Sequence, residues 1–160
     1  MTLTEDLERF RRGAEVLATV LTGAAGEEVD YVPAPDKWTI RQVMAHLADA
    51  ELVGAHRLRL VIAETNPILT SFDEKAWSTN LDYARRKPTQ SLETFRRLRA
   101  ENYELLKELP ESAFERVGSH TENGPMSLRS LLRGYADHAE SHARQLQAIR
   151  TEYKKAKAKK

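Results

Sequence analysis

The sequence predicts an all-α fold, a four-helix bundle with a long crossover linker. Four long segments carry apolar residues at the three- and four-residue spacing of amphipathic helices. No two segments show the apolar–polar alternation typical of paired strands. About two dozen residues, 65–88, separate the second helical segment from the third, which is long for a loop inside a bundle. Such a linker permits a crossover connection instead of simple up-and-down order.

The first predicted helix runs from about residue 3 to residue 21, and Gly23 and Gly26 end it. Its inner face consists of Leu7, Phe10, Ala14, Leu17, Ala18 and Leu21. The loop after it contains two prolines, and within this loop only residues 29–32 are a candidate for a short extended piece.

The second predicted helix starts at Thr39, because Thr39 and Gln42 have the spacing of a capping box. It continues to about Glu64, and Asn66-Pro67 ends it. Inside the linker that follows, residues 72–77 are predicted to form a short helix.

The third predicted helix extends from about Ser91 to Leu109, where Pro110 ends it. Ser127 then caps a fourth helix of about 25 residues. We expect residues 1–153 to form a single domain. Residues 154–160 contain five lysines and no acid, and are predicted to be a disordered tail.

Composition excludes several classes of function. The chain has no cysteine, which excludes disulfides, thiolate metal sites and cysteine nucleophiles, and suits a reducing, cytoplasmic location. No run of 18 apolar residues is present, and the first ten residues are polar and acidic, so neither a membrane span nor a signal peptide is expected. Without the five terminal lysines, 20 basic and 24 acidic residues leave a net charge of −4, so neither nucleic acid nor membrane is an expected partner.

Two histidines of the fourth helix lie at the centre of its inner face. At about 100° per residue, His138 and His142 fall within about 20° of the stripe marked by Leu131 and Ile149. Imidazoles four residues apart can chelate one metal ion, and the alternative is a pair of hydrogen-bonded core histidines. Burying two titratable rings side by side is costly unless a cation or a donor uses their lone pairs, which favours metal. Glu140 faces the opposite way, so this is not the zinc-protease motif.

His46, at the edge of the second helix's inner face, is the preferred third ligand, because a catalytic metal site usually has three protein ligands. His120 is a weaker candidate in the loop before the fourth helix, where an exposed histidine without a ligand role is the favoured alternative. His56 is expected to face solvent. Asp49 and Glu51 are candidate acceptors of hydrogen bonds from the histidine rings. The alternative for both is a solvated helix carboxylate.

Five residues are candidates for the walls of a substrate pocket: Trp38, Phe72, Asp73, Trp77 and Tyr135. For the aromatic residues, packing inside the bundle is the alternative. Three arginines of the third helix are candidates for binding an anionic substrate or, alternatively, for a solvated face: Arg96, Arg97 and Arg99.

Four sequence pieces, in this order, resemble the DinB-like superfamily and its YfiT-like branch. They are residues 37–43, residues 46–49, residues 72–77, and the His138-x-x-x-His142 helix with Gln145-Leu146. The resemblance covers about residues 5 to 150. It implies a four-helix bundle with a crossover, a divalent zinc or nickel ion bound by His46, His138 and His142, and a homodimer.

The resemblance also implies an activity on a small-molecule substrate. Members of the family are described as metal-dependent hydrolases, as S-transferases that use bacillithiol or mycothiol, or as mycothiol-dependent isomerases. A bound metal lowers the pKa of a water toward about 7. A free thiol, with a pKa near about 8.5, is already far more acidic than free water before it binds the metal. We therefore expect an enzyme that activates water or a low-molecular-weight thiol, with thiol transfer favoured, since no residue is evident as a general base. The alternative is a non-catalytic metal-binding or regulatory module.

Overall fold

The structure, a computed structural model, describes residues 1–160. Its α-helices are α1 (Leu3–Arg11), α2 (Gly13–Leu21), α3 (Ile40–Ala63), α4 (Glu74–Asn80), α5 (Pro88–Lys107) and α6 (Leu128–Ala158). Three short 3₁₀ helices are η1 (Gly26–Asp30), η2 (Tyr83–Arg85) and η3 (Glu111–Glu115). The strands are β1 (Ile68–Leu69), β2 (Val117–His120) and β3 (Gly124–Ser127).

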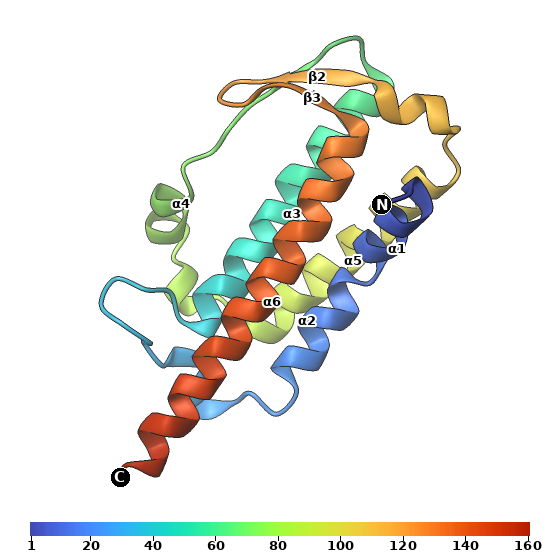
Figure 1. The fold of residues 1–160 in the computed structure, drawn as a ribbon. Coiled ribbons are helices and arrows are strands. Elements are labelled where there is room, and N and C mark those ends of the chain that lie inside the picture. The colour runs from blue at the N-terminus through green and yellow to red at the C-terminus, as the bar shows by residue number, and fades with distance from the viewer.

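The long helices form a four-helix bundle, in which α1 and α2 together supply the first helix (Figure 1). Helix α3 packs against α5 and α6, and the α1–α2 pair packs against the same two helices from the other side. The predicted fold class is therefore confirmed. No helix combines the length and the apolar character needed to cross a bilayer.

Helices α3 and α5 run in the same direction, which requires the crossover that the long linker predicted. Glu51 of α3 pairs with Arg99 of α5, and further along both helices Arg59 pairs with Asn102. The linker carries the chain back along the bundle, so that Arg41, at the start of α3, donates to the Arg86 carbonyl just before α5. Figure 1 shows α4 standing away from the four long helices on this returning segment.

The predicted helix starts are close to those observed. Thr39 and Gln42 form the expected capping box on α3, with their side chains bonding each other's backbone N–H. Ser127 caps α6 by accepting from the Ser130 backbone N–H. Helix α5 begins three residues earlier than expected, at Pro88, because proline already holds the φ angle of a first helical residue. Helix α6 has 31 residues, more than the expected length of about 25, and it extends to Ala158, so residues 154–158 are helical where a disordered tail was expected. The boundary of the domain at residue 153 stays a prediction.

The prediction of one continuous first helix is wrong, because the helix is interrupted at Arg12. The Phe10 carbonyl accepts from Arg99 Nη1 at 2.9 Å, not from the backbone N–H four residues later. Gly13 allows this approach, since a Cβ on Gly13 would lie 2.5 Å from Arg99 Nη1. A side chain from another helix thus breaks the backbone ladder where the sequence shows unbroken periodicity.

A small three-stranded sheet was not expected from the sequence. Strand β1 pairs parallel with β2, and β2 pairs antiparallel with β3, at the end of the bundle where α3 ends and α6 begins. These strands have two to four residues, too few to show an alternating pattern. The candidate extended piece at 29–32 is not a strand, and its first two residues belong to η1.

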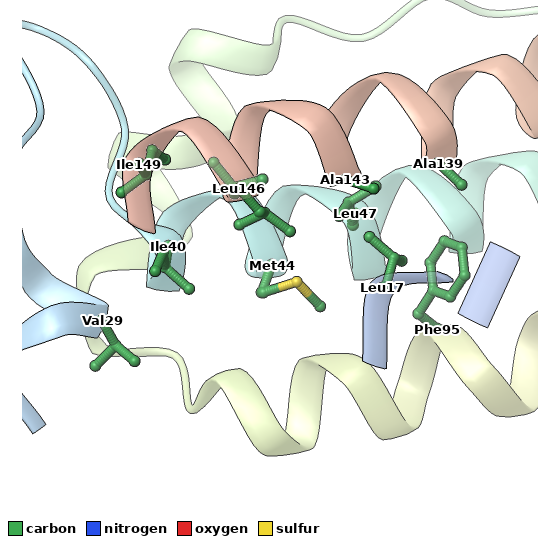
Figure 2. Close-up of a cluster of buried hydrophobic side chains, with 11 residues drawn as sticks. Leu17, Val29, Ile40, Met44, Leu47, Phe95, Ala139, Ala143, Leu146 and Ile149 are labelled. Atoms are coloured by element: carbon green, nitrogen blue, oxygen red, sulfur yellow. The ribbon is translucent and has the colours of Figure 1, made fainter. Parts of the chain in front are cut away.

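The core consists of two apolar clusters along the bundle. Figure 2 shows the first, where side chains of α2, α3, α5 and α6 meet. The second surrounds Phe10 and Phe114 and extends toward the sheet. Arg99 lies between the two clusters, because its guanidinium stacks on Phe95 of the first and on Phe10 of the second.

Candidate metal site

Three histidines from two neighbouring helices meet inside the bundle. His46 comes from α3, and His138 and His142 lie one turn apart on α6. The Nε2 atom of His138 lies 3.1 Å from Nε2 of His46 and 3.1 Å from Nε2 of His142. His46 is buried and the other two are half-buried. The structure therefore brings together the three side chains that the sequence proposed as ligands, each with one ring nitrogen directed to a common point.

Burial keeps two of these rings, His46 and His138, neutral. The pKa of His46 is lowered to about 4, chiefly because burial removes water and secondly because of the charge on His142. The pKa of His138 is lowered to about 3 by burial, and further by His142, His46 and Arg99. At neutral pH both rings therefore offer lone pairs, which is the form that binds metal.

The cluster is better satisfied by a cation than by hydrogen bonds among the rings. One proton between two nitrogens satisfies only one pair, and His138 Nε2 faces two neighbours at the same distance. Nδ1 of His46 is also buried and has no partner. Three imidazoles around a tetrahedral zinc ion, with Zn–N distances of about 2.0–2.1 Å, have nitrogens about 3.3 Å apart. The two separations at His138 Nε2, both 3.1 Å, are close to this value, and either zinc or nickel accepts imidazole ligands.

Gln145 orients one of the three rings, and the sequence did not single it out for this role. Its Oε1 lies 2.7 Å from Nδ1 of His142. Because an amide oxygen only accepts, the proton belongs on Nδ1 and the lone pair on Nε2, which faces the other histidines. The sequence feature that could have revealed this role is the three-residue separation of His142 and Gln145, which places the two side chains next to each other on one helix.

We expect Gln145→Leu to weaken zinc affinity about 10–100-fold, because the ring loses the acceptor that holds its tautomer and orientation. Competition with a chromogenic chelator measures the affinity. Gln147→Leu is the matched control, because Gln147 is exposed on the same helix and its side chain forms no hydrogen bond. Equal affinities of the two variants would contradict this role for Gln145.

Neither predicted carboxylate accepts a hydrogen bond from the histidines. Asp49 accepts from the Tyr83 hydroxyl at 2.8 Å and from Arg86 at 3.0 Å. Glu51 is buried and binds Arg99 through both carboxylate oxygens, at 2.7 and 2.8 Å. Each acid is thus neutralised by an arginine from another part of the chain, and neither is a solvated helix carboxylate.

The remaining two histidines and the three arginines of α5 lie outside the three-histidine cluster. His56 is exposed, as expected. The expectation of an exposed loop position for His120 is wrong, because His120 ends strand β2 and is buried away from the cluster. Its Nδ1 accepts from two backbone N–H groups in the β2–β3 turn. Arg96 and Arg97 are exposed on α5, but the expectation of a solvated or substrate-binding Arg99 is wrong, since this side chain is 1% exposed and paired with Glu51.

A cavity of about 200 Å³ adjoins His138. Of the predicted wall residues, Phe72 and Tyr135 line it. Trp77 stacks on Phe72 with ring centroids 4.6 Å apart and lines a neighbouring groove. Trp38 instead packs against the His46 ring at 5.0 Å, and Asp73 caps α4 by accepting from the Ala76 backbone N–H.

Comparisons with known proteins agree with this site. Residues 9–146 match the family model of the DinB superfamily. A protein of Oceanobacillus iheyensis named "Putative metal-dependent hydrolase" is 33% identical over 139 residues, which are 86% of this chain and 76% of the relative. A Bacillus licheniformis protein of the same description is 30% identical over 150 residues, which are 91% and 85% of the two chains.

A third relative connects the comparison of sequences with that of structures. The Bacillus subtilis protein "Putative metal-dependent hydrolase YfiT" is 33% identical over 106 residues, which are 66% of this chain and 60% of the relative. A solved structure of YfiT from Bacillus subtilis, described as a four-helix bundle of unusual topology, superposes with a TM-score of 0.86 at 24% identity. It covers 93% of this chain and 87% of that chain, and it supports the fold alone.

Proposed function

Because the chain belongs to the DinB superfamily and is similar to YfiT-like proteins, we propose that it is a metal-dependent enzyme acting on a small molecule. The observation that carries the proposal is the convergence of three Nε2 atoms beside a cavity. A divalent zinc or nickel ion held by His46, His138 and His142 would supply Lewis acidity, lowering the pKa of a water or thiol.

The residues around the site prepare it for this chemistry. The three ligands are imidazoles and none is a carboxylate, so the site brings no negative charge that would weaken a cation's pull on a substrate. Gln145 holds His142 in the tautomer with its lone pair on Nε2. Burial lowers the pKa of His46 and of His138, so that both rings are unprotonated at neutral pH. Apolar walls of the adjoining cavity, among them Phe72 and Leu131, reduce access of water to the reacting atoms.

Thiol transfer is the reaction that these residues favour. A general base must lie within hydrogen-bond reach of the proton it removes. The acids Asp49 and Glu51 are already bound to arginines, and Glu74, which lines the cavity, is exposed and forms no hydrogen bond with any of the three histidines. A thiol, with an ordinary pKa of about 8.5, needs less help than water to ionise. The thiol would be a low-molecular-weight co-substrate, because the chain has no cysteine. Hydrolysis is the second candidate, favoured by the names of the relatives.

The two activities are distinguished with purified protein that is stripped of metal and then loaded with zinc or nickel. We expect thiol-dependent turnover of 1-chloro-2,4-dinitrobenzene that disappears on metal removal and returns on reloading. Metal-dependent cleavage of p-nitrophenyl acetate without thiol would favour hydrolysis. His46→Ala should lose the activity, whereas His56→Ala, an exposed histidine of the same helix, should keep it. Tight metal binding without turnover of either compound would indicate the binding or regulatory module.

Partner and location remain as predicted from the sequence. We propose a homodimer that binds neither nucleic acid nor membrane and that resides in the cytoplasm. Light scattering on the eluting protein tests the dimer directly.

A further inference from the structure

The cavity beside His138 contains a positive charge that no acid neutralises. Arg57, in the last third of α3, lines the cavity together with Phe72 and Tyr135. Its Nη1 donates to the Tyr135 hydroxyl at 3.2 Å, and its Nη2 donates to the Thr70 carbonyl at 2.6 Å. Its Nε is buried without any partner, and the guanidinium lies 6.0 Å from the centre of the Phe72 ring.

Other inward-directed arginines of this chain have their charge compensated. Arg99 pairs with Glu51, Arg86 with Asp49 and Arg150 with Glu28, all within 3.0 Å. Arg116 binds only carbonyls, but these are Val61 and Glu64, at the C-terminal end of α3 where the helix dipole is negative.

Arg57 has neither form of compensation. It lies six residues before the last residue of α3, too far for the dipole of the helix end to act on it. Glu74 also lines the cavity, but it is exposed and forms no ion pair with Arg57. A half-buried, unpaired guanidinium with free donors is costly in an apolar cavity unless a ligand supplies the negative charge.

We propose that Arg57 binds the anionic group, a carboxylate or a phosphate, of a small and largely apolar substrate whose opposite end lies at His138. The planar guanidinium suits either anion, and the apolar walls suit the rest of the molecule. The position of the reacting end rests on the proposed function. The recognition of the anion rests only on the cavity and on Arg57, so it is tested without catalysis.

A glycine offers an independent test of the cavity. Gly134 lies inside α6, where glycine costs about 1 kcal/mol relative to alanine. It lines the cavity, and a Cβ built on it meets no atom within 4 Å. The first atom of a side chain here therefore enters open space without a clash, and we expect Gly134→Leu to fold about as well as the wild type while its outer atoms obstruct the cavity.

The test measures binding to metal-free protein, so that a metal ion cannot attract the anion. Phenylacetate, benzylphosphonate and the neutral phenylacetamide are titrated, and dissociation constants are taken from amide chemical-shift changes. We expect wild-type protein to prefer at least one of the two anions over the amide by about tenfold or more, a difference of about 1.4 kcal/mol. The preferred anion then distinguishes carboxylate from phosphate recognition.

Arg57→Gln should abolish the preference, and Arg57→Lys should retain part of it. Arg97→Gln, which removes an exposed arginine of α5, should leave the preference unchanged. Gly134→Leu should weaken binding of all three compounds, which keeps the test decisive if Arg57→Gln does not fold. Equal binding of anions and amide by the wild type, no binding in the millimolar range, or a preference that survives Arg57→Gln would overturn the proposal. Absence of turnover would overturn only the proposed function.

Discussion

Replacing Arg99 with methionine should lower the free energy of unfolding by about 3–5 kcal/mol, the usual cost of breaking a buried ion pair by removing one partner. Arg99 and Glu51 are 1% and 2% exposed, and two hydrogen bonds join them. The guanidinium also donates to the carbonyls of Phe10 and Tyr135, and so connects four segments of the bundle. Methionine keeps much of the volume but leaves the Glu51 charge buried and unpaired. Urea denaturation followed by circular dichroism measures the loss.

A double variant separates the ion pair from the fold around it. Glu51→Leu combined with Arg99→Met should recover most of the stability that Arg99→Met loses, because no charge is then left buried alone. Arg96→Met is the control on the same helix, since Arg96 pairs with Glu93 at the surface and should change stability by no more than about 0.5 kcal/mol. A loss as small for Arg99→Met as for Arg96→Met would contradict the structural role of the pair.

Replacing His138 with alanine should reduce zinc affinity by more than about a hundredfold. Removing a hydrogen-bond partner of a ligand costs about 10–100-fold, and removing the ligand itself should cost more. His138 Nε2 is the atom that faces both other rings, so its removal leaves two nitrogens from different helices. Saturating zinc should raise the melting temperature of the wild type, because a ligand at about 100 times its dissociation constant stabilises by about 2.7 kcal/mol. The variant should show little of this increase at the same zinc concentration.

His56→Ala provides the matched control for metal binding. His56 is an exposed histidine on α3 that lies outside the cluster, so its loss should change neither affinity nor the zinc-induced rise in melting temperature. If His138→Ala bound zinc as tightly as His56→Ala, the three-histidine site would be refuted.

The sequence predicted much of the fold because helical periodicity and capping are local properties. Thr39 and Gln42 are close along the chain, and so are Ser127 and Ser130, so their pairing required no knowledge of distant contacts. The break at Arg12 was missed because its cause, Arg99, lies 89 residues from Phe10 in the sequence. The sheet was missed because its strands are too short to carry a pattern.

The candidate site divides in the same way. The spacing of His138 and His142 placed both on one face of one helix, since side chains four residues apart point in the same direction. Their meeting with His46 agrees with the prediction, but only the packing of α3 on α6 gives the 3.1 Å separations. Only the tertiary structure decided which charged side chains form ion pairs. Asp49 pairs with Arg86 of the linker and Glu51 with Arg99 of α5, whereas Arg57 forms no ion pair with an acid.

The sequence by itself thus determined the four helical segments, the crossover linker and the three histidines, because periodicity, linker length and the limited set of possible ligands are readable along one chain. Only the tertiary structure decided which charges are paired, which ring Gln145 orients, and where the cavity lies. The physical reason is that ion pairing and burial depend on distances between segments that are remote in sequence, and the spacing of residues along a helix carries no information about those distances.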